Sequence, residues 1–122
     1  MKPRFLPAIA VSIALLACAS GSILAANAQP APRRVEVTAK RFGYTPSQIT
    51  LKKGETVVLV LKSADVPHGI RFKDLNVEVK VGKLQTREVT FTPDKIGTFV
   101  GHCSVFCGAG HGAMTLTLAV VE

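Results

Sequence analysis

Four side chains that can bind a metal ion lie close together near the end of the chain. In the segment 101–114, GHCSVFCGAGHGAM, these are Cys103, Cys107, His111 and Met114, with the spacing Cys-x3-Cys-x3-His-x2-Met. The two thiols could form a disulfide, with the imidazole and the thioether as unrelated neighbours. Alternatively, all four groups could be ligands of a soft metal ion. The sequence around them decides between these interpretations.

The type of ligand favours copper over the other candidates. A disulfide between Cys103 and Cys107 would close a very short loop, stabilise weakly and leave His111 and Met114 unexplained. Structural zinc prefers Cys and His, and a thioether is a poor zinc ligand. Iron–sulfur clusters need more cysteines than the two in this segment. Thiolate, imidazole and thioether together are the set that copper selects.

The second thiolate bears on the number of metal ions. A blue-copper site uses one thiolate, two imidazoles and a weak axial ligand. The pair Cys103 and Cys107 therefore suggests two sulfurs that bridge two ions. Such a cluster shares one electron, keeps its geometry nearly fixed and leaves no open position for a substrate, so it favours electron transfer. Two alternatives remain: a copper delivery or storage module, and a disulfide-stapled β-sandwich that binds another molecule.

One more imidazole is needed, and two histidines are available. His68 stands in the segment DVPHGIRF, at the start of an expected strand that follows the apolar run 56–63. His102 directly precedes Cys103, so strand alternation should point its side chain away from the site. We expect His68 to be the ligand and His102 to be partly exposed.

The elements that position these residues are predicted to be β-strands. Short segments alternate apolar and polar residues, and turn signals such as Gly54, Gly82 and Pro93 separate them. No long amphipathic helix is predicted. The pattern is typical of a Greek-key β-sandwich. The expected strands are 34–40, 47–55, 56–63, 68–72, 76–81, 86–93, 97–103 and 115–122.

Together, GHCSVFCGAGHGAM and DVPHGI resemble the copper A domain of cytochrome c oxidase subunit II, in a small or free-standing form. The resemblance covers most of residues 34–122 and implies an all-β, cupredoxin-like sandwich with two copper ions. It also implies a redox donor such as cytochrome c or another cupredoxin, and an oxidase subunit I, as partners. The family usually has Glu where this chain has Val105, which can offer a carbonyl oxygen but no carboxylate. The implied ligands are Cys103 and Cys107 as bridges, His68 and Met114 on one copper, and His111 and the Val105 carbonyl on the other.

The first residues are expected to form a targeting segment. Lys2 and Arg4 precede an apolar stretch without charged side chains, and Ala26-Asn27-Ala28 fits a cleavage site. A cleaved signal peptide is the first interpretation; an uncleaved membrane anchor and a lipoprotein modified at Cys18 are the others. Each places the rest of the chain in the periplasm or on the outer face of the inner membrane. The expected division is 1–28 signal or anchor, 29–33 linker and 34–122 cupredoxin domain.

The charge of the chain argues against nucleic acid as a partner. Lys and Arg number 15 against 8 Asp and Glu, but the basic residues are scattered and the chain has no Trp. No stacking aromatics accompany the charge. The carboxylates of Asp65, Glu78 and Glu88 are expected on the surface, and Phe106 is expected to pack over the metal site.

Overall fold

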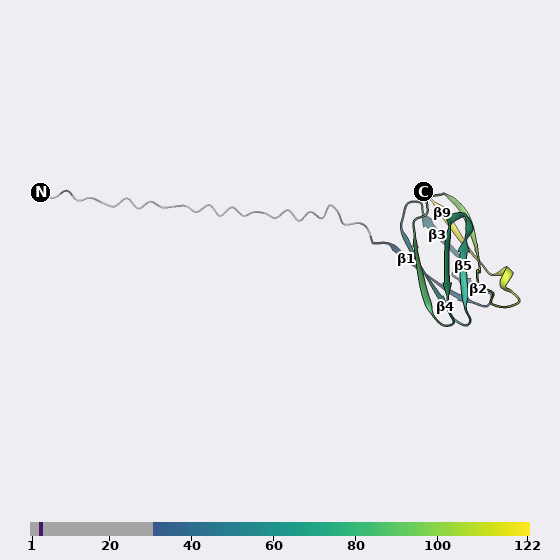
Figure 1. Ribbon diagram of the computed structural model, residues 1–122. Coiled ribbons are helices and arrows are strands. Elements are labelled where there is room, and N and C mark those ends of the chain that lie inside the picture. The colour runs from purple at the N-terminus through teal and green to yellow at the C-terminus, as the bar shows by residue number, and fades with distance from the viewer. Residues whose placement is uncertain (1–2, 4–30) are drawn as a thin grey trace.

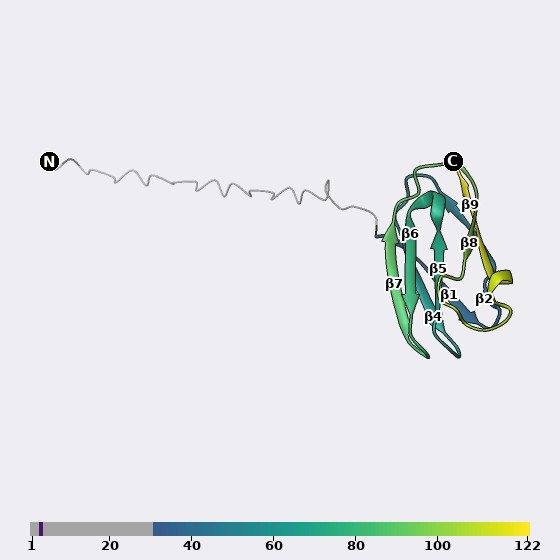
Figure 2. The same cartoon turned by 45° about the vertical axis from the view of Figure 1, so that its right-hand side comes forward.

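Two β-sheets face each other in the computed structural model, which describes Pro3 and residues 31–122. The first sheet has four strands in the order β2-β1-β4-β7, and the second has five in the order β3-β9-β8-β5-β6. Figure 1 and Figure 2 show the two layers from different sides. The strands are β1 (Arg33–Lys40), β2 (Gly43–Thr45), β3 (Gln48–Lys52), β4 (Val57–Ser63), β5 (His68–Phe72), β6 (Val77–Val81), β7 (Thr86–Phe91), β8 (Gly97–His102) and β9 (Thr115–Val121).

Most neighbouring strands are antiparallel, but each sheet contains one parallel pair. β1 runs parallel to β4, and β3 runs parallel to β9. β8 lies between β5 and β9 and is antiparallel to both. Because of these directions, the start of β5, the end of β8 and the start of β9 lie at the same end of the sandwich.

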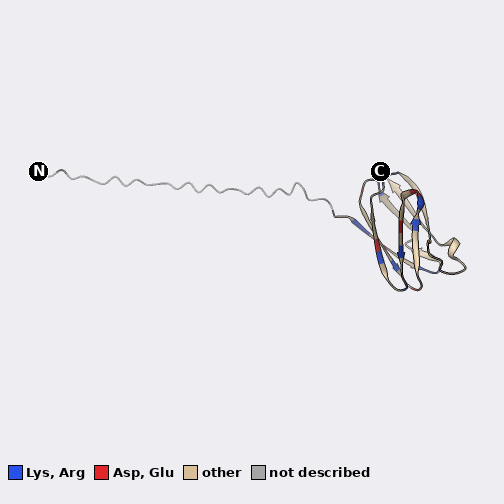
Figure 3. Cartoon of the chain, in the orientation of Figure 1, with Lys and Arg blue, Asp and Glu red and all other residues tan. Residues whose placement is uncertain are grey.

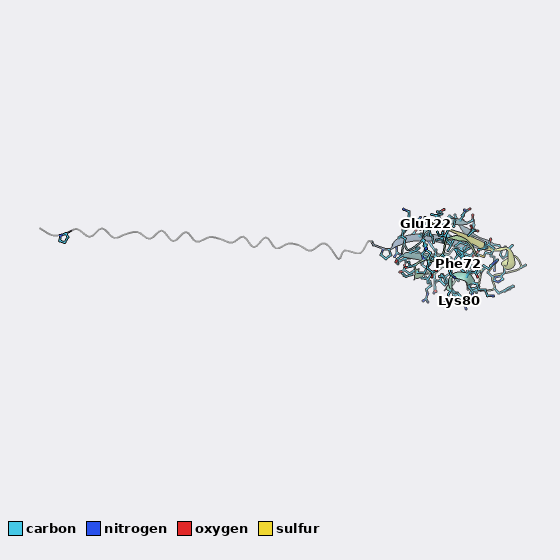
Figure 4. The ribbon with its side chains drawn as sticks, turned by 90° about the horizontal axis from the view of Figure 1, so that it is seen from above. Phe72, Lys80 and Glu122 are labelled. Carbon is cyan, nitrogen blue, oxygen red and sulfur yellow. The ribbon has the colours of Figure 1, made fainter. Side chains whose placement is uncertain are left out.

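The core lies between the sheets and is built from alternate residues of the strands. In β9 the even-numbered residues Leu116, Leu118 and Val120 are buried, whereas their neighbours are partly exposed. In β4 nearly every residue is buried, as the continuous apolar run predicts. Figure 4 shows Phe72 of β5 within the domain and Lys80 of β6 at its edge.

The expected all-β sandwich is confirmed, and all eight predicted strands are present within a few residues of their predicted ends. The sequence missed β2, which is only three residues long, and two short 3-10 turns, Lys73–Leu75 (η2) and His111–Ala113 (η3). Segments this short carry too few residues for a period to be seen.

The predicted targeting segment 1–28 lies outside the described residues, apart from Pro3. Among the helices of the described residues, none is long and apolar enough to cross a membrane.

The sandwich has two distinct ends. The first residue of β1, Arg33, is paired with the start of β4, and Lys53 donates its backbone N–H to the Val121 carbonyl near the C-terminus. The loop between β8 and β9 lies at the opposite end, beside β2 (Figures 1 and 2). The chain of the domain therefore begins and ends far from this loop.

Gly101, inside β8, is required by the core beneath it. A Cβ atom there would lie 2.6 Å from the Phe72 ring and 2.8 Å from the Ile70 side chain. Both neighbours are fully buried and cannot move aside.

We therefore expect Gly101→Ala to lower the free energy of unfolding by about 1–3 kcal/mol, the usual penalty of overpacking a core. Chemical denaturation of the metal-free protein measures this change in the free energy of unfolding. Gly43→Ala is the control, because a Cβ at Gly43 meets nothing within 4 Å. Equal stability of the two variants would contradict this account of the core.

Candidate metal centre

The candidate ligands come from two segments that the fold brings together. His68 is the first residue of β5, and the ligand loop, residues 103–114, joins β8 to β9. The antiparallel pairing of β8 with β9 continues one step beyond the strands, where the Cys103 N–H donates to the Met114 carbonyl at 3.2 Å. This hydrogen bond closes the base of the loop and holds its first and last candidate ligands side by side.

A glycine lets the ligand loop lie against β5. Gly69 follows His68, and a Cβ atom on it would collide with the Ser104 hydroxyl. The absence of a side chain at this position therefore lets the loop come close to the strand that carries the histidine. His68 is thus a candidate ligand, and Gly69 beside it leaves the room that the ligand loop occupies.

The sulfur atoms form the centre of the cluster. Cys103 Sγ and Cys107 Sγ are 3.8 Å apart, and both cysteines are free and buried. A disulfide would bring the two sulfur atoms to about 2.05 Å. The sulfur atom of Cys107 also lies 3.7 Å from His111 Nδ1 and 3.7 Å from Met114 Sδ. Two thiols so placed can face the same metal ions.

The remaining candidates complete the cluster. A ligand atom of His68 lies within 4.8 Å of both cysteine sulfurs, and the Val105 carbonyl oxygen lies 3.1 Å from Cys103 Sγ. All six residues expected from the sequence and the resemblance are thus gathered at one place. They supply thiolate, imidazole, thioether and carbonyl donors.

His68 is oriented by a carboxylate. Its side chain is fully buried, and its Nε2 lies 2.6 Å from Asp65 Oδ1, whereas its Nδ1 is buried without a hydrogen-bond partner among the described residues. An ionised carboxylate only accepts hydrogen bonds, so Nε2 carries the proton and Nδ1 keeps a free lone pair. Metal-binding histidines are held by a carboxylate or carbonyl in this way.

The Asp65 carboxylate is kept ionised by its surroundings. Burial acts to raise its pKa, but hydrogen bonds outweigh this effect and lower the pKa to about 2. The donors are the Arg41 and Val66 backbone N–H groups and the His68 ring. Asp65 is partly exposed, as expected, but its hydrogen bond to His68 was not foreseen. Its spacing to His68, three residues in the segment DVPH, was the signal that could have revealed it.

The site is shielded from water on the sulfur side. Cys103, Cys107 and Met114 are all at most 5% exposed. Burial, with the neighbouring Cys103 thiol as a further cause, raises the pKa of Cys107 to about 11. Burial is also the main cause that raises the pKa of Tyr44, whose hydroxyl donates to the Gly69 carbonyl close to the cluster. Without a metal ion the Cys107 thiol therefore stays protonated near neutral pH, and a metal ion must displace its proton.

Two aromatic or imidazole side chains near the site lie outside it. His102 is exposed, in agreement with strand alternation. Phe106 is 78% exposed, so the expectation that it packs over the site is wrong. Its ring instead lies 5.7 Å from that of His111, at the surface of the loop. Cys18, the third cysteine, lies outside the described residues.

The chain matches known proteins over most of its length. The model of the cupredoxin-like domain family matches residues 8–116. Cytochrome c oxidase subunit 2 of Thermus thermophilus is 34% identical over 72% of this chain and 65% of its own, and a second sequence of that protein is matched over 52% of its length. Nitrous-oxide reductase of Cupriavidus necator is 34% identical over 70% of this chain and 14% of its own. The chain thus spans less than two thirds of these relatives.

A solved structure agrees with the fold. The periplasmic domain of subunit II of the cytochrome oxidase of Bradyrhizobium japonicum superposes with a TM-score of 0.67 at 20% identity, covering 74% of this chain and 84% of that one. The match of the family model, which extends from the N-terminal region into β9 and includes all six candidate ligands, shows that this chain belongs to the cupredoxin-like domain family.

Proposed function

We propose that this protein is a one-electron carrier that holds two copper ions in a mixed-valence centre. The two thiolates would be shared by the ions, and each ion would also be held by one imidazole and one weak ligand. No position is left open for a substrate, so the chain by itself performs no bond chemistry. The proposed ligands are Cys103 and Cys107 for both ions, His68 and Met114 for one ion, and His111 and the backbone carbonyl of Val105 for the other.

The observation that carries this proposal is the pair of buried free thiols 3.8 Å apart. A blue-copper electron carrier with a single ion uses one thiolate, whereas two sulfurs that bridge a pair of ions use both. Further donors are available to both ions. Cys107 has the His111 and Met114 side chains within 3.7 Å, and Cys103 has the Val105 carbonyl at 3.1 Å.

The residues present also fit copper rather than a harder ion. The buried Nδ1 of His68 has no partner among the described residues, and an unpaired polar atom in a buried site is costly unless a ligand takes it. Soft thiolate and thioether donors select copper. When bound, copper supplies the one-electron couple. The chain holds the ligands, orients His68 through Asp65 and excludes water from the sulfurs.

The relatives suggest the setting in which the electron moves. Two are subunits of cytochrome c oxidase, one is a nitrous-oxide reductase, and the structural neighbour is a periplasmic domain. We propose that this chain works outside the cytoplasm. There it would take electrons from a small redox protein such as a cytochrome c or another cupredoxin and pass them to an oxidase subunit I or a similar acceptor.

The N-terminal residues 1–28 are proposed to direct this export, followed by a linker at 29–33 and the copper domain at 34–122. The basic start, the uncharged apolar stretch and the Ala26-Asn27-Ala28 pattern support a cleaved signal. N-terminal sequencing of the protein after export should then begin at Gln29. A sequence that begins at Cys18 would instead indicate a lipoprotein. An intact N-terminus on a membrane-bound protein would indicate an uncleaved anchor.

Copper analysis tests the centre directly. The protein reconstituted with copper should hold two copper ions per chain and develop a purple form. Its electron paramagnetic resonance spectrum should show one unpaired electron shared equally by two copper nuclei. A single copper per chain with the spectrum of an isolated Cu(II) ion would disprove the dinuclear centre.

Removing one bridge should abolish the shared electron. We expect Cys107→Ser to lower the copper content to about one ion per chain and to replace the shared-electron spectrum with that of an isolated Cu(II), because one oxygen ligand cannot replace a bridging thiolate. Ser104→Ala, in the same loop, is the matched control. Its hydroxyl has no hydrogen-bond partner among the described residues, so that variant should keep both ions. A Cys107→Ser protein with the wild-type spectrum would exclude Cys107 as a bridge.

Redox cycling separates an electron carrier from a copper delivery module. A carrier should keep both ions through repeated reduction and oxidation in the presence of a Cu(I) chelator, because its ligands are preorganised and buried. A delivery module should transfer Cu(I) to the chelator on the first reduction. Copper remaining per chain after each cycle is the measurement.

A further inference from the structure

The turn between β1 and β2 contacts both segments that carry the candidate ligands, the region of Asp65 and His68 and the ligand loop 103–114. Arg41 is the first residue of this turn, and its backbone N–H donates to Asp65 Oδ2 at 2.9 Å. Its side-chain Nε–H donates to the Cys107 carbonyl at 2.9 Å. Arg41 is therefore hydrogen-bonded both to Asp65, which contacts the candidate ligand His68, and to the main chain of the candidate ligand Cys107.

These bonds continue to the histidine. The second oxygen of the carboxylate, Asp65 Oδ1, lies 2.6 Å from His68 Nε2 and accepts the Val66 N–H at 2.7 Å. A continuous hydrogen-bonded path thus runs from His68 through Asp65 and Arg41 to Cys107. It joins the start of β5 to the ligand loop, and none of its hydrogen bonds uses a side-chain atom that is free to bind a metal ion.

The neighbouring Phe42 adds a packing contact to the same loop. A Cβ atom on Gly110 would lie 2.6 Å from the Phe42 ring, and one on Gly108 would lie 2.9 Å from it. Gly108 also has a φ of 139°, which only glycine adopts without strain. The ligand loop can therefore settle on the Arg41-Phe42 turn only because it has no side chains at these two positions.

We infer that Arg41 is a positioning residue of the metal centre. Resting on the proposed function, the inference is that the Arg41 side chain sets the place of Cys107 relative to His68, slows copper release and fixes the electronic structure of the centre. A guanidinium bonded to a carbonyl is a charge-assisted hydrogen bond and is stronger than a neutral one. Sites held in place by such outer contacts lose metal more slowly than sites that must assemble around the ion.

Two substitutions of nearly equal shape isolate the hydrogen bond. In Gln the side-chain Nε2 stands at the chain position of the Arg Nε, whereas in Met that position is a methyl group. Arg41→Gln and Arg41→Met both remove the charge, but only the first keeps a donor for the Cys107 carbonyl. Arg34→Met on β1 is the surface control, because Arg34 is exposed and, within the described part of the chain, pairs only with Glu88 at 2.8 Å.

Three measurements are made on the copper-loaded full chain: the rate of copper loss to a chelator, the reduction potential and the copper hyperfine splitting. We expect Arg41→Met to lose copper about tenfold faster, the lower end of the usual effect of an outer-contact mutation, and to change the potential and the hyperfine splitting. Arg41→Gln, which keeps the donor but not its charge, should lie clearly closer to wild type than Arg41→Met in all three. Arg34→Met should be indistinguishable from wild type.

Three results would overturn the inference. If Arg41→Met loses copper at the wild-type rate and has the wild-type spectrum, Arg41 does not position the metal centre, even if that variant unfolds more easily. Equal defects in Arg41→Met and Arg41→Gln would assign the effect to the charge rather than the hydrogen bond. Should Arg41→Met fail to fold, Arg41→Ala takes its place, and wild-type behaviour of that variant has the same meaning. The copper content of the wild-type protein tests the proposed function separately.

Discussion

The antiparallel pairing of β8 with β9 is the constraint on which the metal centre depends. It brings the two ends of the ligand loop together, and the bond from the Cys103 N–H to the Met114 carbonyl closes the loop. Since β8 is also paired with β5, the same strand sets the distance from the loop to His68. Candidate ligands separated by more than thirty residues are therefore held by one strand and its two neighbours.

The sulfur atoms of the candidate site are shielded from water, whereas the outer surface of the ligand loop is exposed. The three sulfur-bearing residues are buried in the core, and Met114 continues directly into the apolar face of β9. His111 and Phe106 lie at the surface of the same loop, which carries no Lys, Arg, Asp or Glu and is drawn entirely in tan in Figure 3. The low exposure of the sulfurs limits how much the surrounding water must reorganise when charge changes, and the partly exposed imidazole keeps the centre near the surface.

Much of the fold and four of the six candidate ligands could be predicted from local sequence patterns. His68 follows from the choice between two histidines, and the Val105 carbonyl is implied only by the family resemblance. Alternating residues mark strands such as 34–40 and 76–81, and the spacing of two cysteines, a histidine and a methionine is specific. The carboxylate of Asp65 could have been found from its distance to His68 along the chain. The part played by Arg41 could not, because it depends on two hydrogen bonds to residues distant in sequence and on a turn next to a strand of only three residues.

The two ends of the sandwich have different surroundings. Strand β1 starts at the end opposite to the ligand loop (Figure 1). A linker to a membrane or to another protein would therefore hold the domain by its far end and leave the ligand loop uncovered. On such a linker the domain could turn without its own attachment covering the loop that carries most of the candidate ligands.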